Sequence, residues 1–204
     1  MSSQLAHWAT FLSSEGLDGD VRGPFTGWLL QAHPGLAERW SSLFCSLPHS
    51  FCRSFNGCSI SIATVWELIK GLEQHDCLIP VRHAVPKRKA EFVAGRLCAE
   101  FSLLAAGAQS QFVGRSPDGS PIWPLAIVGA ISHTDTTAYA AVARQSGRYS
   151  IGLDSELLKY ASMIEEMADV FCTGGEKARW LSQRSRPGTL LLIFSAKESL
   201  FKAV

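Results

Sequence analysis

The sequence predicts an α+β fold whose strands pair antiparallel. Apolar or alternating stretches at 125–131 and 139–143 lie close together in the chain, and a third, at 149–154, follows after a Ser-Gly turn signal. Connections this short leave no room for crossover helices, so these strands are expected to form an antiparallel meander. Helical spacing of apolar residues over 85–104, and a predicted helix over 189–202, supply the α part.

Composition narrows the class of protein. At 204 residues and 47% hydrophobic content, the chain can form one domain or two small packed lobes. The net charge of +1 gives no overall attraction to nucleic acid or to a membrane surface. The longest apolar run, 189–194, is far shorter than the ~20 residues of a membrane span, and residues 1–10 lack a secretion signal. We therefore expect a cytoplasmic protein without a transmembrane segment.

The cysteines and histidines predict no zinc site. Six cysteines occur without a Cys-x-x-Cys pair, and the six histidines do not complete a metal-ligand spacing. Reduced thiols are therefore expected, and Cys98 falls on the apolar side of a predicted helix, where it serves as a small core residue.

Residues 1–75 are the least informative part of the chain. Apolar clusters at 29–30 and 40–44 predict short helices. Asn56-Gly57 is a typical hairpin signal and predicts a strand at 59–65, while 65–72 is compatible with either a strand or a helix.

A helix is predicted to begin near Pro86 and to end at Gly107, because proline suits a first helical turn and glycine a helix end. One face is apolar, and the other carries basic residues: Lys87, Arg88, Lys89 and Arg96. The ordinary interpretation of such a cluster is a solvated helix face. A loop rich in Gly, Pro, Ser and Asp is predicted over 114–124, either functional or simply an anchored surface loop.

Acidic residues stand out in the C-terminal part, where helices are predicted over 162–171, from 173–176 to 181, and from Thr189. Asp154 and Glu156 would share one face of a strand, with Ser155 on the reverse side. Glu198 and Lys202 would share one face of the final helix. Carboxylates that converge on one pocket repel each other unless a cation such as Mg²⁺ lies between them. Taken singly, each pair is better explained as charged residues on a solvent-exposed surface.

Two segments, Gly152-Leu153-Asp154-Ser155-Glu156 and Phe194-Ser195-Ala196-Lys197-Glu198-Ser199-Leu200-Phe201-Lys202, together resemble the 4′-phosphopantetheinyl transferases of the enterobactin synthetase component D type. Ser155 departs from the apolar residue usual in that family. Three further matches are Arg88-x-x-Glu91-Phe92-x-x-Gly95-Arg96, Pro121-Ile122-Trp123-Pro124, and Gly129-Ala130-Ile131-Ser132-His133, in which Ala130 replaces a usual serine.

The resemblance, which spans 85–204, implies two pseudo-symmetric α+β lobes with antiparallel sheets. The N-terminal lobe would comprise residues 1–145, of which 1–75 match weakly and 85–145 bind coenzyme A. The C-terminal lobe, 146–204, would carry the metal and catalytic residues. Family members continue with further strands, so this lobe is expected to be incomplete at Val204.

The implied reaction transfers 4′-phosphopantetheine from coenzyme A to a serine of an acyl or peptidyl carrier protein. The resemblance assigns a catalytic role to Glu198 as base and to Lys202. It assigns Mg²⁺ to Asp154, Glu156 and Glu198. Phosphates would be held by Arg88, Arg96 and His133, and the adenine end by residues 118–121. The coenzyme A residues are thus Arg88, Arg96, Asp118, Gly119, Ser120, Pro121, Ser132, His133, Asp154, Glu198 and Lys202.

Two alternatives remain open at this point. One is a truncated, non-catalytic member of the same fold that binds coenzyme A or a carrier protein. The other is a magnesium-dependent phosphohydrolase, which the basic set Arg88, Arg96 and His133 disfavours. The subtype points to siderophore or other nonribosomal peptide synthesis, by analogy alone. A monomer is expected because two-lobed members of the class usually act alone.

Overall fold

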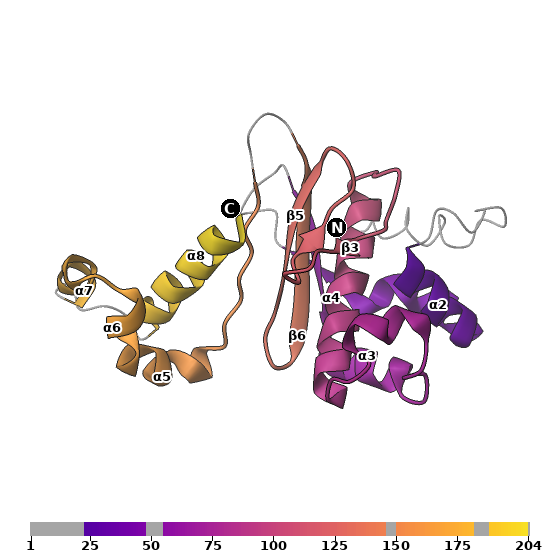
Figure 1. The fold of residues 1–204 in the computed structure, drawn as a ribbon, viewed down its shortest axis with the longest axis horizontal. Coiled ribbons are helices and arrows are strands. Elements are labelled where there is room, and N and C mark those ends of the chain that lie inside the picture. The colour runs from indigo at the N-terminus through magenta and orange to yellow at the C-terminus, as the bar shows by residue number, and fades with distance from the viewer. Residues whose placement is uncertain (1–22, 48–54, 146–149, 182–187, 204) are drawn as a thin grey trace.

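The computed structural model describes residues 23–47, 55–145, 150–181 and 188–203, and it has the predicted mixture of helices and antiparallel strands (Figure 1). Its centre is a four-stranded antiparallel sheet in the order β1-β2-β6-β5. The strands are β1 (Phe44–Ser46), β2 (Asn56–Ser61), β5 (Ile127–His133) and β6 (Thr137–Arg144). The α+β class is therefore confirmed.

Helix α4 (Pro86–Ala105) packs across this sheet and contacts β2, β5 and β6. It begins with Pro86 and is followed by Gly107, whose φ of 63° is in the left-handed region that glycine adopts easily, as predicted. Gly95 allows the close approach to the sheet, because a Cβ there would lie 2.8 Å from Cγ2 of Ile131. This approach brings the middle of α4 next to the end of β5.

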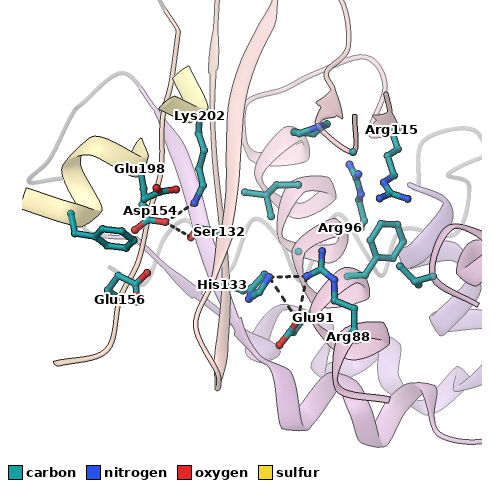
Figure 2. A pocket seen from close by; sticks show the side chains of 17 residues that line it. Arg88, Glu91, Arg96, Arg115, Ser132, His133, Asp154, Glu156, Glu198 and Lys202 are labelled. Carbon is teal, nitrogen blue, oxygen red and sulfur yellow. Dashed lines mark hydrogen bonds and ion pairs between the residues drawn. The ribbon is translucent and has the colours of Figure 1, made fainter. Parts of the chain in front are cut away.

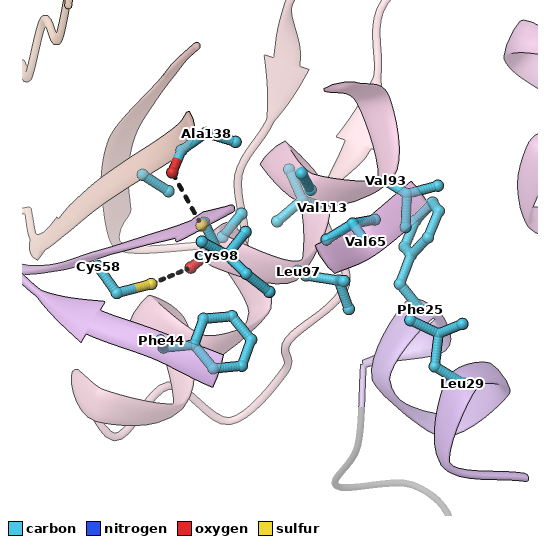
Figure 3. Close-up of a cluster of buried hydrophobic side chains, with 14 of the residues drawn as sticks. Phe25, Leu29, Phe44, Cys58, Val65, Val93, Leu97, Cys98, Val113 and Ala138 are labelled. Atoms are coloured by element: carbon cyan, nitrogen blue, oxygen red, sulfur yellow. Dashed lines mark hydrogen bonds between the residues drawn. The ribbon is translucent and has the colours of Figure 1, made fainter. Parts of the chain in front are cut away.

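The hydrophobic core lies between α4, the sheet and the N-terminal helices (Figure 3). Val93, Leu97 and Cys98 of α4 are fully buried, so the prediction of Cys98 as a core residue is confirmed. The Cys98 thiol donates to the backbone oxygen of Ala138 on β6 at 3.5 Å. The N-terminal elements that contribute to this core are α2 (Pro24–Ala32), η1 (Pro34–Leu43), α3 (Ile62–Ile69) and η2 (Asp76–Val81).

Glu100 of α4 anchors α2 through its buried carboxylate. Its oxygens accept hydrogen bonds from the backbone N–H groups of Phe25 and Thr26, at 3.0 and 2.8 Å, and from the Thr26 hydroxyl at 2.7 Å. These are donors that the first turn of a helix leaves without intrahelical partners. Burial is the main cause that raises the pKa of Glu100 to about 7.

The hairpin prediction at Asn56-Gly57 is wrong. Both residues lie inside β2, where they pair with Val142 and Ala141 of β6. Gly57 is needed there for close packing, because a Cβ would lie 2.9 Å from the backbone oxygen of Ala140. The chain then turns at Ser61, whose hydroxyl caps α3, so the predicted strand at 59–65 ends earlier than expected.

Strands β5 and β6 confirm the first two strands of the predicted meander, although β5 begins at Ile127 and leaves Leu125 99% exposed. The predicted third strand is wrong over its described residues, because 151–157 pair with no strand. This segment packs instead against α8 (Thr189–Ala203): a Cβ on Gly152 would lie 1.7 Å from the backbone oxygen of Ser199. The turn predicted at 146–147 lies outside the described residues.

Among the described residues from 151 to 203, helices begin at Leu158 and there is no strand, so the second antiparallel sheet is not found among them. Figure 1 shows these helices set apart from the sheet, joined to it through the 151–157 segment. They are η3 (Leu158–Tyr160), α5 (Ala161–Glu166), α6 (Ala168–Phe171), α7 (Gly174–Leu181) and α8. Among the residues described, no helix is both long and apolar enough to cross a membrane.

The predicted loop at 114–124 contains a small hairpin. Strand β3 (Gly114–Arg115) pairs antiparallel with β4 (Pro121–Ile122), and Gly119 has a φ of 94° in the connecting turn. Gly-rich sequence at this point therefore marks a tight turn with defined geometry.

Candidate functional site

A cavity of about 430 Å³ lies between α4, the end of β5, the β3–β4 hairpin, the 151–157 segment and α8 (Figure 2). Ten of the twelve predicted site residues line it. They are Arg88, Arg96, Gly119, Pro121, Ser132, His133, Asp154, Glu156, Glu198 and Lys202. Segments more than one hundred residues apart in the chain therefore meet at one place.

Acidic residues occupy the wall formed by the C-terminal segments. Lys202 Nζ lies 2.5 Å from Oδ1 of Asp154, whose side chain is 6% exposed. The Ser132 hydroxyl donates to the same oxygen at 3.3 Å, which ties the end of β5 to the 151–157 segment. Glu156 and Glu198 also line the cavity, so Asp154, Glu156, Glu198 and Lys202 share one lining.

Ser155 does not face away from the site as predicted. Its hydroxyl donates to the Ser132 hydroxyl at 3.2 Å, next to Asp154. The expectation relied on the alternation of side chains along a strand, and 151–157 is not a strand. A serine at this position adds a hydrogen bond beside the acidic wall.

Basic residues occupy the opposite wall, formed by α4 and the end of β5. Arg88 Nη1 donates to Nε2 of His133 at 2.9 Å and to Glu91 at 3.3 Å (Figure 2). Glu91 is buried and lies 3.8 Å from Nε2 of His133. The carboxylate of Glu91 therefore holds Arg88 and His133 together at the cavity surface.

Arg96 lies deeper in the same wall and is buried. Its Nη1 donates to the backbone oxygens of Val113 and Gly114, at 3.3 and 3.1 Å, and its guanidinium lies 5.3 Å from the centre of the Phe92 ring. Burial first, and the nearby Arg115 second, lower the pKa of Arg96 to about 10. The basic face of α4 is therefore only partly solvated.

Asp118 and Ser120 lie outside the cavity, unlike their predicted neighbours Gly119 and Pro121. Asp118 shapes the turn of the β3–β4 hairpin, where its Oδ1 accepts from the backbone N–H of Ser120 at 3.0 Å and from the Ser116 hydroxyl. These hydrogen bonds, with that of Ser116 first, hold the pKa of Asp118 at about 2.

Seven residues that line the cavity were not among the predicted site residues: Val81, Glu91, Phe92, Gly95, Arg115, Ile131 and Phe194. Arg115 sits in the loop whose later residues were selected, and its charge was the available signal. Val81 and Phe194 look like ordinary core residues in the sequence, so no pattern could have separated them.

Lys197 and Glu176 connect α7 and α8 outside the cavity. Lys197 Nζ donates to the backbone oxygen of Phe171 at 2.6 Å and to Glu176 at 2.9 Å. Glu176 also accepts from the backbone N–H and the hydroxyl of Thr173, which makes a reciprocal cap at the start of α7. These contacts fix the orientation of α8, and hence of Glu198.

The acidic wall fits a divalent cation in two respects. Oδ2 of Asp154 is buried and has no hydrogen-bond partner. Burial, and then the charge of Asp154, raise the pKa of Glu156. A cation would give Oδ2 of Asp154 a partner and would reduce the repulsion between Asp154 and Glu156. Mg²⁺ is commonly coordinated by such carboxylate oxygens. As placed, however, the described residues contain no group of three His, Cys, Asp or Glu side chains arranged to hold a metal ion.

Comparison with known families gives two adjacent matches. A model described as the 4′-phosphopantetheinyl transferase N-terminal domain matches residues 74–143. A second, described as the 4′-phosphopantetheinyl transferase superfamily, matches residues 150–204. Together they cover more than half of the chain and include every side chain that lines the cavity.

Individual relatives carry the same names. The 4′-phosphopantetheinyl transferase Npt of Nocardia iowensis is 34% identical over 60% of this chain and 54% of its own length. Enterobactin synthase component D is 38% identical in Salmonella typhimurium, over 65% of this chain and 53% of the relative. It is also 38% identical in Escherichia coli K12, over 60% and 58% respectively. The chain thus spans about half the length of the curated relatives that it matches.

Proposed function

This chain belongs to the 4′-phosphopantetheinyl transferase superfamily, and from that premise we propose that it transfers the 4′-phosphopantetheine group of coenzyme A to a serine hydroxyl of an acyl or peptidyl carrier protein. The observation that carries the proposal is the cavity itself. Acids from the C-terminal segments face arginines and a histidine from α4 and β5 across one space. A substrate that carries phosphates and reacts beside a cation suits this division of charge.

The basic wall is proposed to bind the nucleotide of coenzyme A. Arg88 and His133 would contact the 3′-phosphate, since a guanidinium can hold two phosphate oxygens and an imidazole ring N–H can donate a further hydrogen bond. Glu91 keeps the two side chains together at 3.3 and 3.8 Å. Gly119 and Pro121 of the hairpin, which line the cavity, would border the adenine end.

The acidic wall is proposed to hold Mg²⁺ through Asp154, Glu156 and Glu198. When bound, the ion would neutralise charge that develops on the pyrophosphate oxygens. The partnerless Oδ2 of Asp154 and the raised pKa of Glu156 support this assignment. Lys202, which now pairs with Asp154, can turn to a phosphate oxygen.

Transfer needs one proton acceptor and one phosphate contact from the chain. Glu198 is proposed to accept the proton of the carrier serine while the serine oxygen forms a bond to the β-phosphorus of coenzyme A. This phosphorus carries the pantetheine arm. The bond from this phosphorus to the bridging oxygen breaks, and adenosine 3′,5′-bisphosphate leaves with that electron pair. Lys202, one turn away on α8, would stabilise the leaving phosphate.

The carrier is proposed to belong to siderophore or other nonribosomal peptide synthesis. The names of two relatives, which concern enterobactin synthesis, support this narrower proposal. Cytoplasmic location, a monomeric state and the division into lobes at 1–145 and 146–204 stay predictions from the sequence.

The test is a mass measurement on the carrier. The purified chain is incubated with coenzyme A, Mg²⁺ and an apo carrier protein, with a carrier whose target serine is alanine as the control. A gain of one phosphopantetheine arm on the apo carrier alone is expected. Coenzyme A binding without a mass gain would support the non-catalytic alternative instead, and release of inorganic phosphate would support a phosphohydrolase. Peptidyl carriers of a siderophore synthetase and fatty-acid carriers, compared side by side, test the pathway.

A further inference from the structure

Ser155 lies next to the acidic wall, although it does not line the cavity. Its half-buried side chain donates a hydrogen bond to the Ser132 hydroxyl at 3.2 Å, and Ser132 donates in turn to Oδ1 of Asp154 at 3.3 Å. Both hydrogen bonds join the 151–157 segment to β5. The described residues of this segment pair with no strand, so side chains rather than a β-ladder hold it beside the end of β5.

The three side chains can donate in only one order. A carboxylate accepts hydrogen bonds and does not donate them, and a serine hydroxyl has a single proton. Ser132, which is 5% exposed, therefore gives its proton to Asp154, and its oxygen accepts the proton of Ser155. Hydrogen bonds in such a chain polarise one another, so the bond from Ser155 strengthens the one that Ser132 makes.

This order of donors decides which oxygen of Asp154 is left open. Oδ1 receives two donors, the Ser132 hydroxyl and Nζ of Lys202 at 2.5 Å (Figure 2). Oδ2 is buried and has no hydrogen-bond partner among the described residues. A buried carboxylate oxygen without a partner costs free energy, and a cation beside it would remove that cost. The donors on Oδ1 therefore keep Oδ2 available to a ligand with positive charge.

The two donors on Oδ1 have different parts in the proposed reaction. Lys202 is proposed to turn to a phosphate oxygen, and Oδ1 then depends on the Ser132 hydroxyl. The direction of that hydroxyl depends on Ser155. An apolar residue, which the family usually has at position 155, could not donate this hydrogen bond. The arrangement is therefore a feature of this chain.

We propose that Ser155 is a positioning residue that acts through Ser132 and holds the carboxylate of Asp154 so that Oδ2 stays open to a divalent cation. This inference rests on the proposed function, which assigns Mg²⁺ to the acidic wall. Hydrogen-bonded groups behind a metal ligand commonly tune its affinity for the metal, and Ser155 lies one step further from the site. Both hydrogen bonds are longer than the about 2.8 Å usual for hydroxyl donors, so an effect of a few fold is expected.

The test is calorimetric titration of Mg²⁺ into the full chain saturated with coenzyme A, after subtraction of the heat from coenzyme A alone. Ser155→Ala is expected to weaken Mg²⁺ binding about 3- to 10-fold, the range for one neutral hydrogen bond. Ser155→Thr keeps the hydroxyl and should stay within about twofold of the unchanged chain. Ser162→Ala makes the same change as Ser155→Ala at an exposed serine of α5 that does not line the cavity, and it should leave the affinity unchanged.

A double-mutant cycle separates positioning from a general loss of structure. In a chain that already carries Ser132→Ala, the further change Ser155→Ala should alter the Mg²⁺ affinity less than about twofold, because Ser155 acts through the Ser132 hydroxyl. A loss of affinity that adds in full to that of Ser132→Ala would overturn the inference. An unchanged affinity in Ser155→Ala alone would overturn it as well.

The mass measurement on the carrier keeps this inference apart from the proposed function. If the unchanged chain transfers the arm and binds Mg²⁺, but Ser155→Ala binds Mg²⁺ equally well, only the role of Ser155 is lost. If the unchanged chain binds no Mg²⁺ in the presence of coenzyme A, the assignment of the cation to the acidic wall fails, and the inference fails with it.

Discussion

Glu198 lies one helical turn before Lys202 on α8, and both side chains face the cavity. In the proposed reaction its carboxylate accepts the serine proton, which an amide of the same shape cannot do. Glu198→Gln is therefore expected to lower the transfer rate by a factor on the order of 10² to 10⁴. Binding of coenzyme A, measured by calorimetry, should stay within a few fold, because the basic wall is unchanged.

Glu166 provides the matched control for this substitution. It is an exposed glutamate of α5 that does not line the cavity, so Glu166→Gln makes the same chemical change away from the site. Its transfer rate should equal that of the unchanged chain. Near-normal turnover by Glu198→Gln would remove this residue from the mechanism.

At the scale of single residues, the sequence identified most of the charged groups of the site, with Glu91 and Arg115 missed, but not their contacts. Arg88 and Arg96 look equivalent on a helix, yet one is paired with His133 and the other with backbone oxygens. The partners of the two arginines differ because β3 passes close to Arg96 on α4. The spacing of residues in the sequence does not show where this strand passes. The strand-based placement of Ser155 failed for a related reason, since the segment follows α8 rather than a sheet.

Among the elements, the 151–157 segment and α8 approach each other closely at Gly152. A Cβ on Gly152 would lie 1.7 Å from the backbone oxygen of Ser199, so Gly152→Ala must displace the helix or the segment. Either movement separates Glu198 from Asp154. We expect a loss of transfer of about 100-fold or more, as is typical when catalytic groups are misplaced by an ångström. Overpacking should also cost about 1–3 kcal/mol of stability.

Gly175 is the control for that substitution, because a Cβ there meets nothing within 4 Å. Gly175→Ala, within α7, should leave turnover unchanged and leave the melting temperature equal or slightly higher. Transfer at the normal rate by Gly152→Ala would show that this contact is not required.

Glu100 makes the attachment of α2 to α4 dependent on pH. Its pKa is raised from the ordinary 4.5 to about 7, chiefly by burial. The folded state therefore holds this proton more tightly than the unfolded state. The resulting stabilisation is complete below about pH 4.5 and is lost as pH rises through about 7, at most about 3 kcal/mol.

Glu100→Gln, which cannot titrate, isolates this effect. The difference in the free energy of unfolding between the unchanged chain and the variant, followed by urea denaturation, should shift in favour of the unchanged chain as pH falls from 7 to 4.5. Glu67→Gln, on an exposed residue of α3, should show no such trend. A pH-independent difference for Glu100→Gln would contradict the raised pKa.

At the scale of elements, the long periodic segments were predictable and the close contacts were not. Helix α4 and strands β5 and β6 agree with the sequence because each has a strong hydrophobic period. Asn56-Gly57 gave a wrong turn prediction because Gly57 lies in β2, where its missing side chain allows close packing against β6. The segment at 149–154 was apolar enough for a strand, but its described residues gain their burial from a helix.

In the whole molecule, Asp135 connects the sheet to the C-terminal helices. This residue of the β5–β6 turn accepts from Lys87 of α4 at 3.0 Å, from Lys159 of η3 at 2.9 Å, and from the Tyr160 hydroxyl. These contacts, with that of Tyr160 first, lower the pKa of Asp135. The contact should therefore persist from the ordinary aspartate range up to the pH at which the lysines lose their charge, and it should weaken in strong acid.

Asp135→Asn is expected to loosen the C-terminal helices relative to the sheet, because an amide keeps one acceptor but loses the charge. Faster amide hydrogen exchange over 158–166, together with reduced transfer, would report the loosening. Asp169→Asn, which breaks an exposed pair with Lys177 within the C-terminal helices, is the control. Exchange rates that match those of the unchanged chain would show that Asp135 does not connect the two regions.

The shared cavity has a consequence for cooperativity. Its two walls come from chain regions with separate buried clusters, a large one around α4 and a small one that includes Ala168, Cys172 and Leu190. A nucleotide that spans both walls acts as a non-covalent crosslink, and its binding energy adds to whatever joins the regions. Calorimetric melting should therefore resolve two transitions in the free chain, and these should merge into one as coenzyme A approaches saturation.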